Sequence, residues 1–218
     1  MANTTDNAPG VDIGTADHQP VAPAVTGPAS FADPGPLGLG AFAMTTFVLS
    51  CVNAGILKLG VGSIVLSLAL FYGGGAQLLA GMWEFRKNNT FGALAFTSYG
   101  AFWLSYWGLS KFFVPEQGTS AGDAGNAVGV FLIAWFIFTA YMTVAALRVS
   151  GAVTSVFVLL TITYLVLAIG EFATSTGVTK VGGVIGILTA LAAWYTSFAG
   201  VTNTTWRRTV LPTWPAQQ

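Results

Sequence analysis

The chain has 218 residues, of which 54% are hydrophobic and only 7% are charged, and its mean hydropathy is +0.69. Because soluble domains carry about 25% charged residues, this composition excludes an ordinary water-soluble globule and predicts an integral membrane protein. The 8 basic and 8 acidic residues balance, which gives no indication of a nucleic-acid partner.

The residue types needed for metal binding and nucleophilic catalysis are scarce. His18 and Cys51 are the single histidine and the single cysteine, so no disulfide can form within one chain and the usual His/Cys metal clusters are excluded. His18 lies in the N-terminal region, away from the apolar segments, which argues against a Ser-His-Asp or Cys-His catalytic centre. We therefore expect no metal, no cofactor and no enzymatic activity.

The N-terminal region precedes the apolar part of the chain. Residues 1–32 are rich in Ala, Pro, Thr and Asp and show no apolar period, so we expect a disordered cytoplasmic tail in which His18 is solvated. The region has no basic start and no apolar core, so it is not a secretory signal. Pro34 and Pro36 favour an extended approach to the first apolar segment, and Asp33 can cap the helix that follows.

Six apolar segments follow, each near the ~20 residues that a membrane-spanning helix needs. They lie near residues 37–57, 62–83, 91–112, 126–148, 153–170 and 180–201. Open sheets cannot span lipid, so the segments predict an all-α membrane protein with six transmembrane helices. The transmembrane domain covers residues 33–212 and is followed by a short cytoplasmic tail at 213–218.

Six spans place both termini on one side of the membrane. The loops on that side carry five basic residues, Arg86, Lys87, Arg148, Arg207 and Arg208. The opposite side carries three, Lys58, Lys111 and Lys180, together with Glu116, Asp123 and Glu171. The excess of basic residues predicts that both termini lie in the cytoplasm.

One face of the first span carries polar residues. Phe42, Thr45, Leu49 and Asn53 share this face because they are spaced three or four residues apart. The amide of Asn53 suits a route for a hydrogen-bonding solute, and it equally suits a hydrogen bond that holds two helices together. For Thr45 the sequence favours the helix–helix bond.

The second span carries a similar face, formed by Gly74, Gln77, Gly81 and Glu84. The glycine run 73–75 indicates either close helix packing, which is the commoner use, or a local break whose carbonyls face a cavity. Gln77 lies inside the span and can both donate and accept hydrogen bonds. Glu84 lies at the rim near basic residues, where an ion pair or a helix anchor is favoured over a proton carrier.

The third span has an aromatic face, which comprises Tyr99, Phe102, Trp103 and Tyr106. Such a stripe is typical of packing or of an interfacial belt, but Tyr99 follows Thr97 and Ser98 well inside the membrane. The tetrad at 96–99 is echoed at 138–141, which is compatible with two related three-helix halves.

Charged residues are missing from the middle of every predicted span. Proton-driven transporters commonly use buried carboxylates or histidines as relays, and ATP-driven transport needs a P-loop, which the sequence lacks. The sequence therefore favours a passive or channel-like route, or one in which the proton travels with the solute as its neutral acid.

Several longer motifs occur in order along the chain. They are Pro34 and Pro36-Leu37-Gly38-Leu39 with Phe42, Phe71-Tyr72-Gly73-Gly74 with Ala76-Gln77, Ala80-Gly81 with Glu84, Asn89-Thr90-Phe91-Gly92, and Ala95-Phe96-Thr97-Ser98-Tyr99-Gly100. This set resembles the acetate uptake transporter family, also called the GPR1/FUN34/yaaH family. The resemblance covers roughly residues 33–212.

The resemblance implies a six-helix protomer that assembles into a hexamer, with a pathway for acetate and related short carboxylates in each protomer. It also implies an apolar constriction, which by motif position falls on Phe42, Tyr99 and Leu160. The helix faces point independently to the first two residues and not to Leu160. The chain departs from the family pattern at Asp33, where Asn is usual, and at Asn88, where Gly is usual. Both departures lie at membrane edges and bear on the loops rather than on the pathway.

Together these features predict transport of acetate and related short-chain carboxylates across the cytoplasmic membrane, by a channel-like or proton-linked route. Polar side chains would offer hydrogen bonds to a carboxylate as it loses water, namely Thr45, Asn53, Gln77, Thr97 and Ser98 with Tyr99. The constriction would reject large or highly hydrated solutes. Two alternatives stay open, a pore for another small solute such as ammonia or urea, and a non-transporting membrane sensor or assembly protein. The expected partners are small carboxylates, the lipid bilayer and further copies of the chain.

Overall fold

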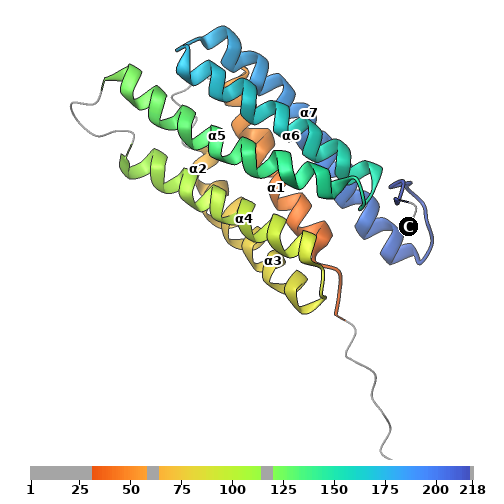
Figure 1. Cartoon of the computed structure of the whole chain (residues 1–218). Helices are drawn as coiled ribbons and strands as arrows, with labels where there is room; N and C mark the ends of the chain where they lie inside the picture. The colour runs from red at the N-terminus through yellow and green to blue at the C-terminus, as the bar shows by residue number, and fades with distance from the viewer. Residues whose placement is uncertain (1–30, 58–63, 114–119, 217–218) are drawn as a thin grey trace, which may run out of the picture. The chain divides into compact units, whose positions relative to one another are not determined.

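The helices of the structure follow the predicted apolar segments. The computed structural model describes residues 31–57, 64–113 and 120–216, and Figure 1 shows its helices packed side by side. Their bounds are α1 Gly35–Asn53, α2 Ile64–Leu70, α3 Gln77–Arg86, α4 Thr90–Gly108, α5 Ala121–Ala146, α6 Gly151–Phe172 and α7 Thr176–Trp206. A π-helical stretch at Phe71–Ala76 joins α2 to α3, and another at Leu109–Phe113 extends α4.

Some sequence predictions concern residues that the structure does not describe. The predicted disordered tail lies outside the described residues except for Phe31 and Ala32. His18 and the loop residues Lys58 and Glu116 also lie outside them.

The predicted spans differ from the observed helices at their ends, and the first and the last span are two examples. The first, 37–57, extends too far, because α1 ends at Asn53 and the chain then turns at Gly55, whose φ of 77° lies in the left-handed region that glycine adopts readily. The last, 180–201, is too short at both ends, because α7 begins at Thr176 and ends at Trp206. Ser175 sets the earlier start, since its hydroxyl accepts a hydrogen bond from the first turn of α7.

Five helical segments among the described residues are long and apolar enough to cross a membrane. They are Gly35–Asn53, Ile64–Arg86, Gly122–Ala146, Gly151–Phe172 and Thr176–Trp206. The predicted span 91–112 is not among them, although α4 has 19 residues. Its hydroxyl and aromatic residues, which include Thr97, Ser98, Tyr99 and Tyr106, lower its hydropathy. The chain is therefore an all-helical, multi-pass membrane protein.

α1 lies between two groups of helices. On one side it packs against α7, which packs against α6, and α6 packs against α5. On the other side it packs against α3 and the π-helical stretch before it, and α3 packs against α4. The backbones of α4 and α5 make few close contacts, and these two helices meet through large aromatic side chains. The main internal cavity, described below, lies beside these two helices.

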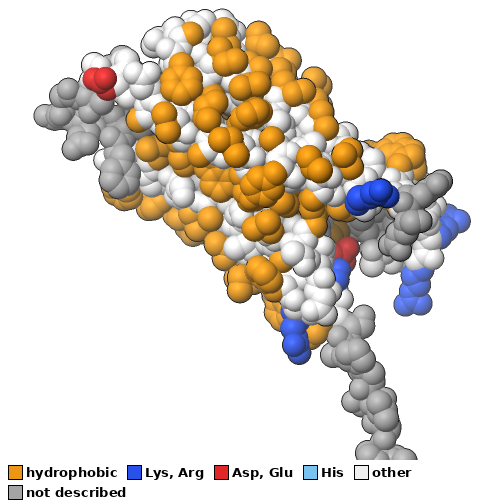
Figure 2. Space-filling model, in the orientation of Figure 1, with side chains coloured by type: hydrophobic (Ala, Val, Ile, Leu, Met, Phe, Trp, Pro, Cys, Tyr) orange, Lys and Arg blue, Asp and Glu red, His pale blue; other side chains and the backbone are white. Residues whose placement is uncertain are grey.

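The helix ends fall into two groups, as Figure 1 shows. The start of α1, the α3–α4 turn, the α5–α6 turn and the end of α7 lie together, and we call this the basic end. Its basic residues are Arg86, Lys87, Arg148, Arg207 and Arg208, and Figure 2 shows Lys and Arg side chains gathered there on the visible face. The opposite end of the bundle is called the far end.

A polar cluster ties α1, α3 and α4 together at the basic end. Lys87 Nζ lies 2.8 Å from Asp33 Oδ1, and the same oxygen accepts the Gly35 N–H at 3.1 Å. The N-cap position of α1 is Pro34 rather than Asp33. Asn89 caps α4, and its Nδ2 donates to Glu84 Oε2 at 2.8 Å. Glu84 is only 1% exposed. This burial and amide bond favour the interpretation of Glu84 as a helix anchor.

The glycine run in the second span permits close packing. A Cβ on Gly73 would lie 2.6 Å from Thr45 Oγ1 of α1 and 2.8 Å from Trp103 Cδ1 of α4, so only glycine allows this approach. The helix continues through the run as a π-helical turn and passes directly into Gln77 at the start of α3. The close-packing interpretation is confirmed, and the run widens the helix without breaking it.

The described part of the predicted C-terminal tail packs on the bundle. Gly151 at the start of α6 donates its N–H to the carbonyl of Trp214 at 2.8 Å. Tyr195 of α7 donates to the carbonyl of Pro212 at 2.7 Å, and its ring stacks on Trp214 with centroids 6.1 Å apart. These contacts hold the segment before residue 217 against α6 and α7.

The contact between α1 and α7 depends on Gly183. A Cβ at this position would lie 2.7 Å from the carbonyl carbon of Asn53 and 2.8 Å from Ala54 Cα, so Gly183→Ala must push backbone apart. We expect a loss of about 1–3 kcal/mol of stability, the usual effect of overpacking, measured as a lower Tm in detergent solution. Gly108→Ala is the control, because no described atom lies within 4 Å of the added Cβ. Equal Tm values for the two variants would contradict this packing.

Candidate functional site

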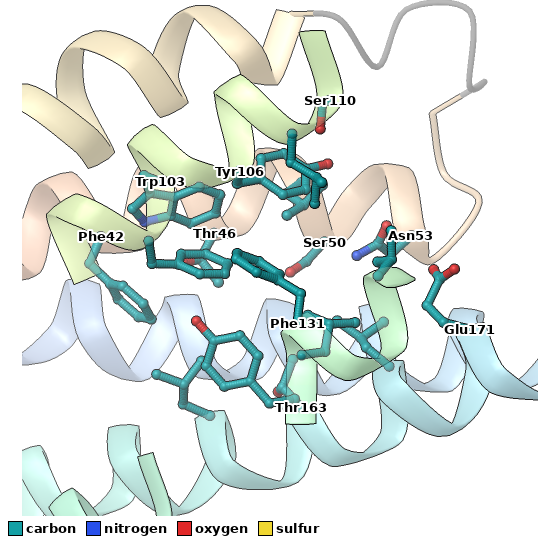
Figure 3. Close-up of a pocket in the computed structure, with 18 residues that line it drawn as sticks. Phe42, Thr46, Ser50, Asn53, Trp103, Tyr106, Ser110, Phe131, Thr163 and Glu171 are labelled. Carbon is teal, nitrogen blue, oxygen red and sulfur yellow. The ribbon is translucent and has the colours of Figure 1, made fainter. Parts of the chain in front are cut away.

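A cavity of about 390 Å³, which we call the main cavity, lies between α1, α4, α5 and α6. Its lining residues are Phe42, Thr46, Leu49, Ser50, Asn53, Phe102, Trp103, Tyr106, Leu109, Ser110, Val128, Phe131, Leu132, Leu160, Thr163, Tyr164, Leu167 and Glu171. Figure 3 shows Phe42 at one end of this cavity and Asn53 and Glu171 at the other. Asn53 ends α1 and Glu171 lies near the end of α6, so this second end is toward the far end of the bundle.

The α1 face on the main cavity differs slightly from the predicted one. It passes through Thr46 and Ser50 between Phe42 and Asn53. Thr45, which was placed on this face by sequence spacing, does not line the cavity. Its hydroxyl donates to Ala41 O at 2.9 Å within α1, and this backbone bond agrees with a structural role.

The opposite wall of the main cavity is aromatic. Phe102 of α4 lies with its ring centroid 5.7 Å from that of Phe131 and 5.4 Å from that of Tyr164. Trp103 and Tyr106 extend this wall along α4, as Figure 3 shows. The predicted aromatic stripe of the third span therefore borders the cavity in addition to packing.

Two buried polar atoms of cavity-lining residues lack a hydrogen-bond partner among the described residues. They are Thr46 Oγ1 and Trp103 Nε1. Their residues are only 6% and 2% exposed. A buried polar group without a partner is unfavourable by about 1–3 kcal/mol, and in this conformation neighbouring atoms enclose both of these atoms almost completely. The sequence analysis did not single out Thr46.

A second cavity of about 20 Å³, which we call the small cavity, lies on the other side of Phe42 and Leu160. These two residues line both cavities. The small cavity is also bordered by Gln77 and Tyr99, with Leu39, Ala95, Phe96, Val156 and Phe157. The structure thus brings together the three residues of the predicted constriction, and it places two of them where the cavities meet.

Gln77 is the most polar residue of the small cavity. It is 1% exposed, and neither its Oε1 nor its Nε2 has a hydrogen-bond partner in the described part of the chain. Its amide can both donate and accept. The sequence analysis selected this residue, and the structure places it beside Phe42, Tyr99 and Leu160.

Tyr99 is enclosed by other rings. Its centroid lies 5.7 Å from that of Phe42, 5.4 Å from Phe138, 6.0 Å from Phe157 and 6.1 Å from Trp135. Its hydroxyl is hydrogen-bonded to another side chain rather than left without a partner. The aromatic contacts come from α1, α5 and α6, so the ring of Tyr99 is where these helices and α4 meet.

Two other predicted polar residues lie apart from both cavities. Thr97 faces α3, where a Cβ on Gly81 would collide with its hydroxyl, and Thr97 Oγ1 is buried without a partner in the described chain. Ser98 is half-buried and lines neither cavity. The predicted tripeptide therefore contributes Tyr99 to the site, while Thr97 contributes to the α3–α4 contact.

Glu171 was counted among loop residues from sequence, but it lies in the last turn of α6 and lines the main cavity. Its spacing from Leu160, Tyr164 and Leu167 gives the signal, because residues 160, 164, 167 and 171 follow one helix face. It places a carboxyl group beside Asn53 at the far end of the cavity (Figure 3).

The arrangement offers hydrogen-bonding groups and apolar walls. Within the described ranges, no group of three or more His, Cys, Asp or Glu residues is placed to hold a metal ion. The polar groups deep inside the site are uncharged, and they include Gln77, Thr46 and Trp103. Such a site can bind and guide a small polar molecule.

Comparisons with known proteins identify relatives of this chain. Ammonia transport outward protein 2 of Saccharomyces cerevisiae is 41% identical over 177 residues, which are 78% of this chain and 62% of that protein. Succinate-acetate/proton symporter SatP of Escherichia coli strain K12 is 38% identical over 186 residues, 85% of this chain and 97% of that protein. A solved structure of the bacterial acetate channel SatP matches with a TM-score of 0.77 and 39% identity, covering 84% of this chain and 99% of that one.

This chain spans 62% of the length of three fungal relatives that it matches, two of them from Saccharomyces cerevisiae and one from Emericella nidulans. A family model, described as the GPR1/FUN34/yaaH family, matches residues 15–217. The match covers nearly the whole chain, and the helical bundle agrees with the solved structure over 84% of its length. The chain belongs to the GPR1/FUN34/yaaH family.

Proposed function

We propose that this chain forms a membrane route for acetate and related short-chain carboxylates. The observation that carries the proposal is the pair of cavities that meet at Phe42 and Leu160, with unpartnered buried polar atoms on both sides. The names of relatives support the choice of solute, because one is a succinate-acetate/proton symporter and the matching structure is an acetate channel.

The route runs from the main cavity past Phe42 and Leu160 to the small cavity. A carboxylate that enters the main cavity loses water and meets the side chains of Thr46 and Trp103. Gln77 then offers a donor and an acceptor beyond the constriction. Rings and a leucine at the narrow point exclude solutes that are large or that keep their hydration shell. Thr45, Thr97 and Ser98 have supporting roles in helix packing, and Asn53 acts at the mouth.

The membrane arrangement is also part of the proposal. α4 is taken as the sixth crossing, because its face at Tyr99, Phe102 and Trp103 is buried and borders the cavities. The gathering of basic residues at the basic end supports a plasma-membrane protein with both termini in the cytoplasm. Six copies would assemble into a hexamer through the apolar outer faces, and each copy would keep its own route.

A second candidate solute is ammonia, which is favoured by the name of the yeast relative. Ammonia is small and neutral, so it also suits a route without charged groups at its narrow point. Competition separates the two solutes, since a carboxylate route is blocked by excess propionate, whereas an ammonia route is not.

Purified protein in liposomes tests the proposal. Uptake of labelled acetate is followed at neutral pH together with the internal pH, with and without an imposed proton gradient. We expect uptake above that of protein-free liposomes, reduced by excess propionate and not by ammonium. Internal acidification with uptake identifies proton-linked or neutral-acid transport. Absence of protein-dependent acetate uptake would overturn the proposal.

Replacement of Gln77 separates transport from stability. Gln77→Leu removes two polar atoms that have no partner among the described residues, so the Tm should stay the same or rise. Acetate uptake should fall about 2- to 10-fold, as expected when a hydrogen bond worth about 0.5–1.5 kcal/mol is lost from the route. A lower Tm with unchanged uptake would show that Gln77 has a structural role instead.

Phe42 and Phe47 form a matched pair on α1. Phe42 borders both cavities, whereas Phe47 packs on Trp194 with centroids 5.2 Å apart and lines neither cavity. Phe42→Ala should widen the narrow point and raise the butyrate-to-acetate uptake ratio about threefold or more, since size exclusion is relaxed. Phe47→Ala should leave this ratio unchanged. The assignment of Phe42 fails if both variants keep the wild-type ratio.

A further inference from the structure

The hydroxyl of Tyr99 is bonded to a side chain outside the proposed route. Tyr99 Oη lies 2.9 Å from Thr139 Oγ1 of α5, and Thr139 is fully buried and lines neither cavity. We propose that Thr139 is a positioning residue, which holds the Tyr99 ring at the constriction and thereby sets the size selectivity of the passage. This inference rests on the proposed function.

The direction of this hydrogen bond follows from the number of protons available. Thr139 Oγ1 donates to Trp135 O at 2.7 Å, and a threonine hydroxyl has one proton. Thr139 therefore accepts, and Tyr99 donates. In this conformation Tyr99 has no hydrogen left to offer a carboxylate, so its contribution is the position of its ring.

The bond joins two helices whose backbones make few close contacts. Aromatic rings fill the space between α4 and α5, and Tyr99–Thr139 is the only side-chain hydrogen bond between these helices among the described residues. Phe138, the neighbour of Thr139, meets the Tyr99 ring edge to face at 5.4 Å. Two adjacent residues of α5 thus fix both the ring and the hydroxyl of Tyr99.

This contact also joins the two similar four-residue segments that the sequence contains. Residues 96–99 and 138–141 approach each other in space, through Tyr99 of the first and Phe138 and Thr139 of the second. Removal of the Thr139 hydroxyl leaves the Tyr99 hydroxyl without a partner in a buried site, and such a group is unfavourable. Loss of this bond from either side also releases the Tyr99 ring from α5, so that the ring shifts at the constriction.

The test uses Thr139→Val, which keeps the shape and removes the hydroxyl, and Thr139→Ser, which keeps the hydroxyl. The matched control is Thr143→Val, one turn along α5. Thr143 donates to Thr139 O at 2.8 Å and bonds Thr161 Oγ1 at 2.9 Å, but it lines neither cavity. The readout is the ratio of butyrate to acetate uptake in liposomes, which a merely structural role does not move.

We expect Thr139→Val to change this ratio about threefold or more, an effect in the range of a lost hydrogen bond, while Thr139→Ser and Thr143→Val keep the wild-type value. Tyr99→Phe removes the other end of the same bond, so it should match Thr139→Val, and the double variant should show no further change. A wild-type ratio in Thr139→Val overturns the inference. If that variant does not fold, a wild-type ratio in Tyr99→Phe overturns it. Failure of the wild-type protein to carry acetate overturns the proposed function, and the inference with it.

Discussion

A polar side chain buried among membrane-spanning helices needs a hydrogen-bond partner, and this constraint organises the interior of the bundle. Many buried hydroxyls meet it within their own helix, as Thr45, Thr163 and Thr189 do by donating to backbone carbonyls. Gln77 and Trp103 instead keep polar atoms without partners among the described residues, and both border cavities. Thr97 Oγ1 also has no partner among the described residues but borders neither cavity, so the proposed solute-binding role rests on both properties together.

The cavities arise because some pairs of helices pack closely while others stay farther apart. Gly73 brings the second span close to α1, and Gly183 brings α7 close to α1. The backbones of α4 and α5 lie farther apart, and aromatic rings and the main cavity occupy the space beside them. Close backbone packing around α1 and the wider, ring-filled spacing of α4 and α5 therefore leave room for the two cavities.

Much of the fold follows from hydrophobic length, because apolar segments of about 20 residues predict membrane helices. Gln77 was also predictable, since an amide inside an apolar segment needs a partner. The predicted polar face of α1 included Thr45, whereas the observed cavity-lining face includes Thr46. These two threonines are adjacent in the sequence, and spacing alone does not decide which one faces a neighbouring helix. Glu171 was missed because the end of α6 was placed too early, at residue 170. The bond between Tyr99 and Thr139 joins distant segments, and no local pattern specifies it.

The central claim is that Gln77 lies in a passage reached by water and carboxylates. It is tested most directly by placing the only cysteine of the protein at this position, as Gln77→Cys with Cys51→Ala, and measuring its reaction with a small charged thiol reagent. Thr45→Cys in the same background is the control, because Thr45 packs on Gly73 outside both cavities. The account predicts that Gln77→Cys reacts, that acetate slows the reaction, and that Thr45→Cys does not react. An unreactive Gln77→Cys, or a reaction that acetate leaves unchanged, would contradict it.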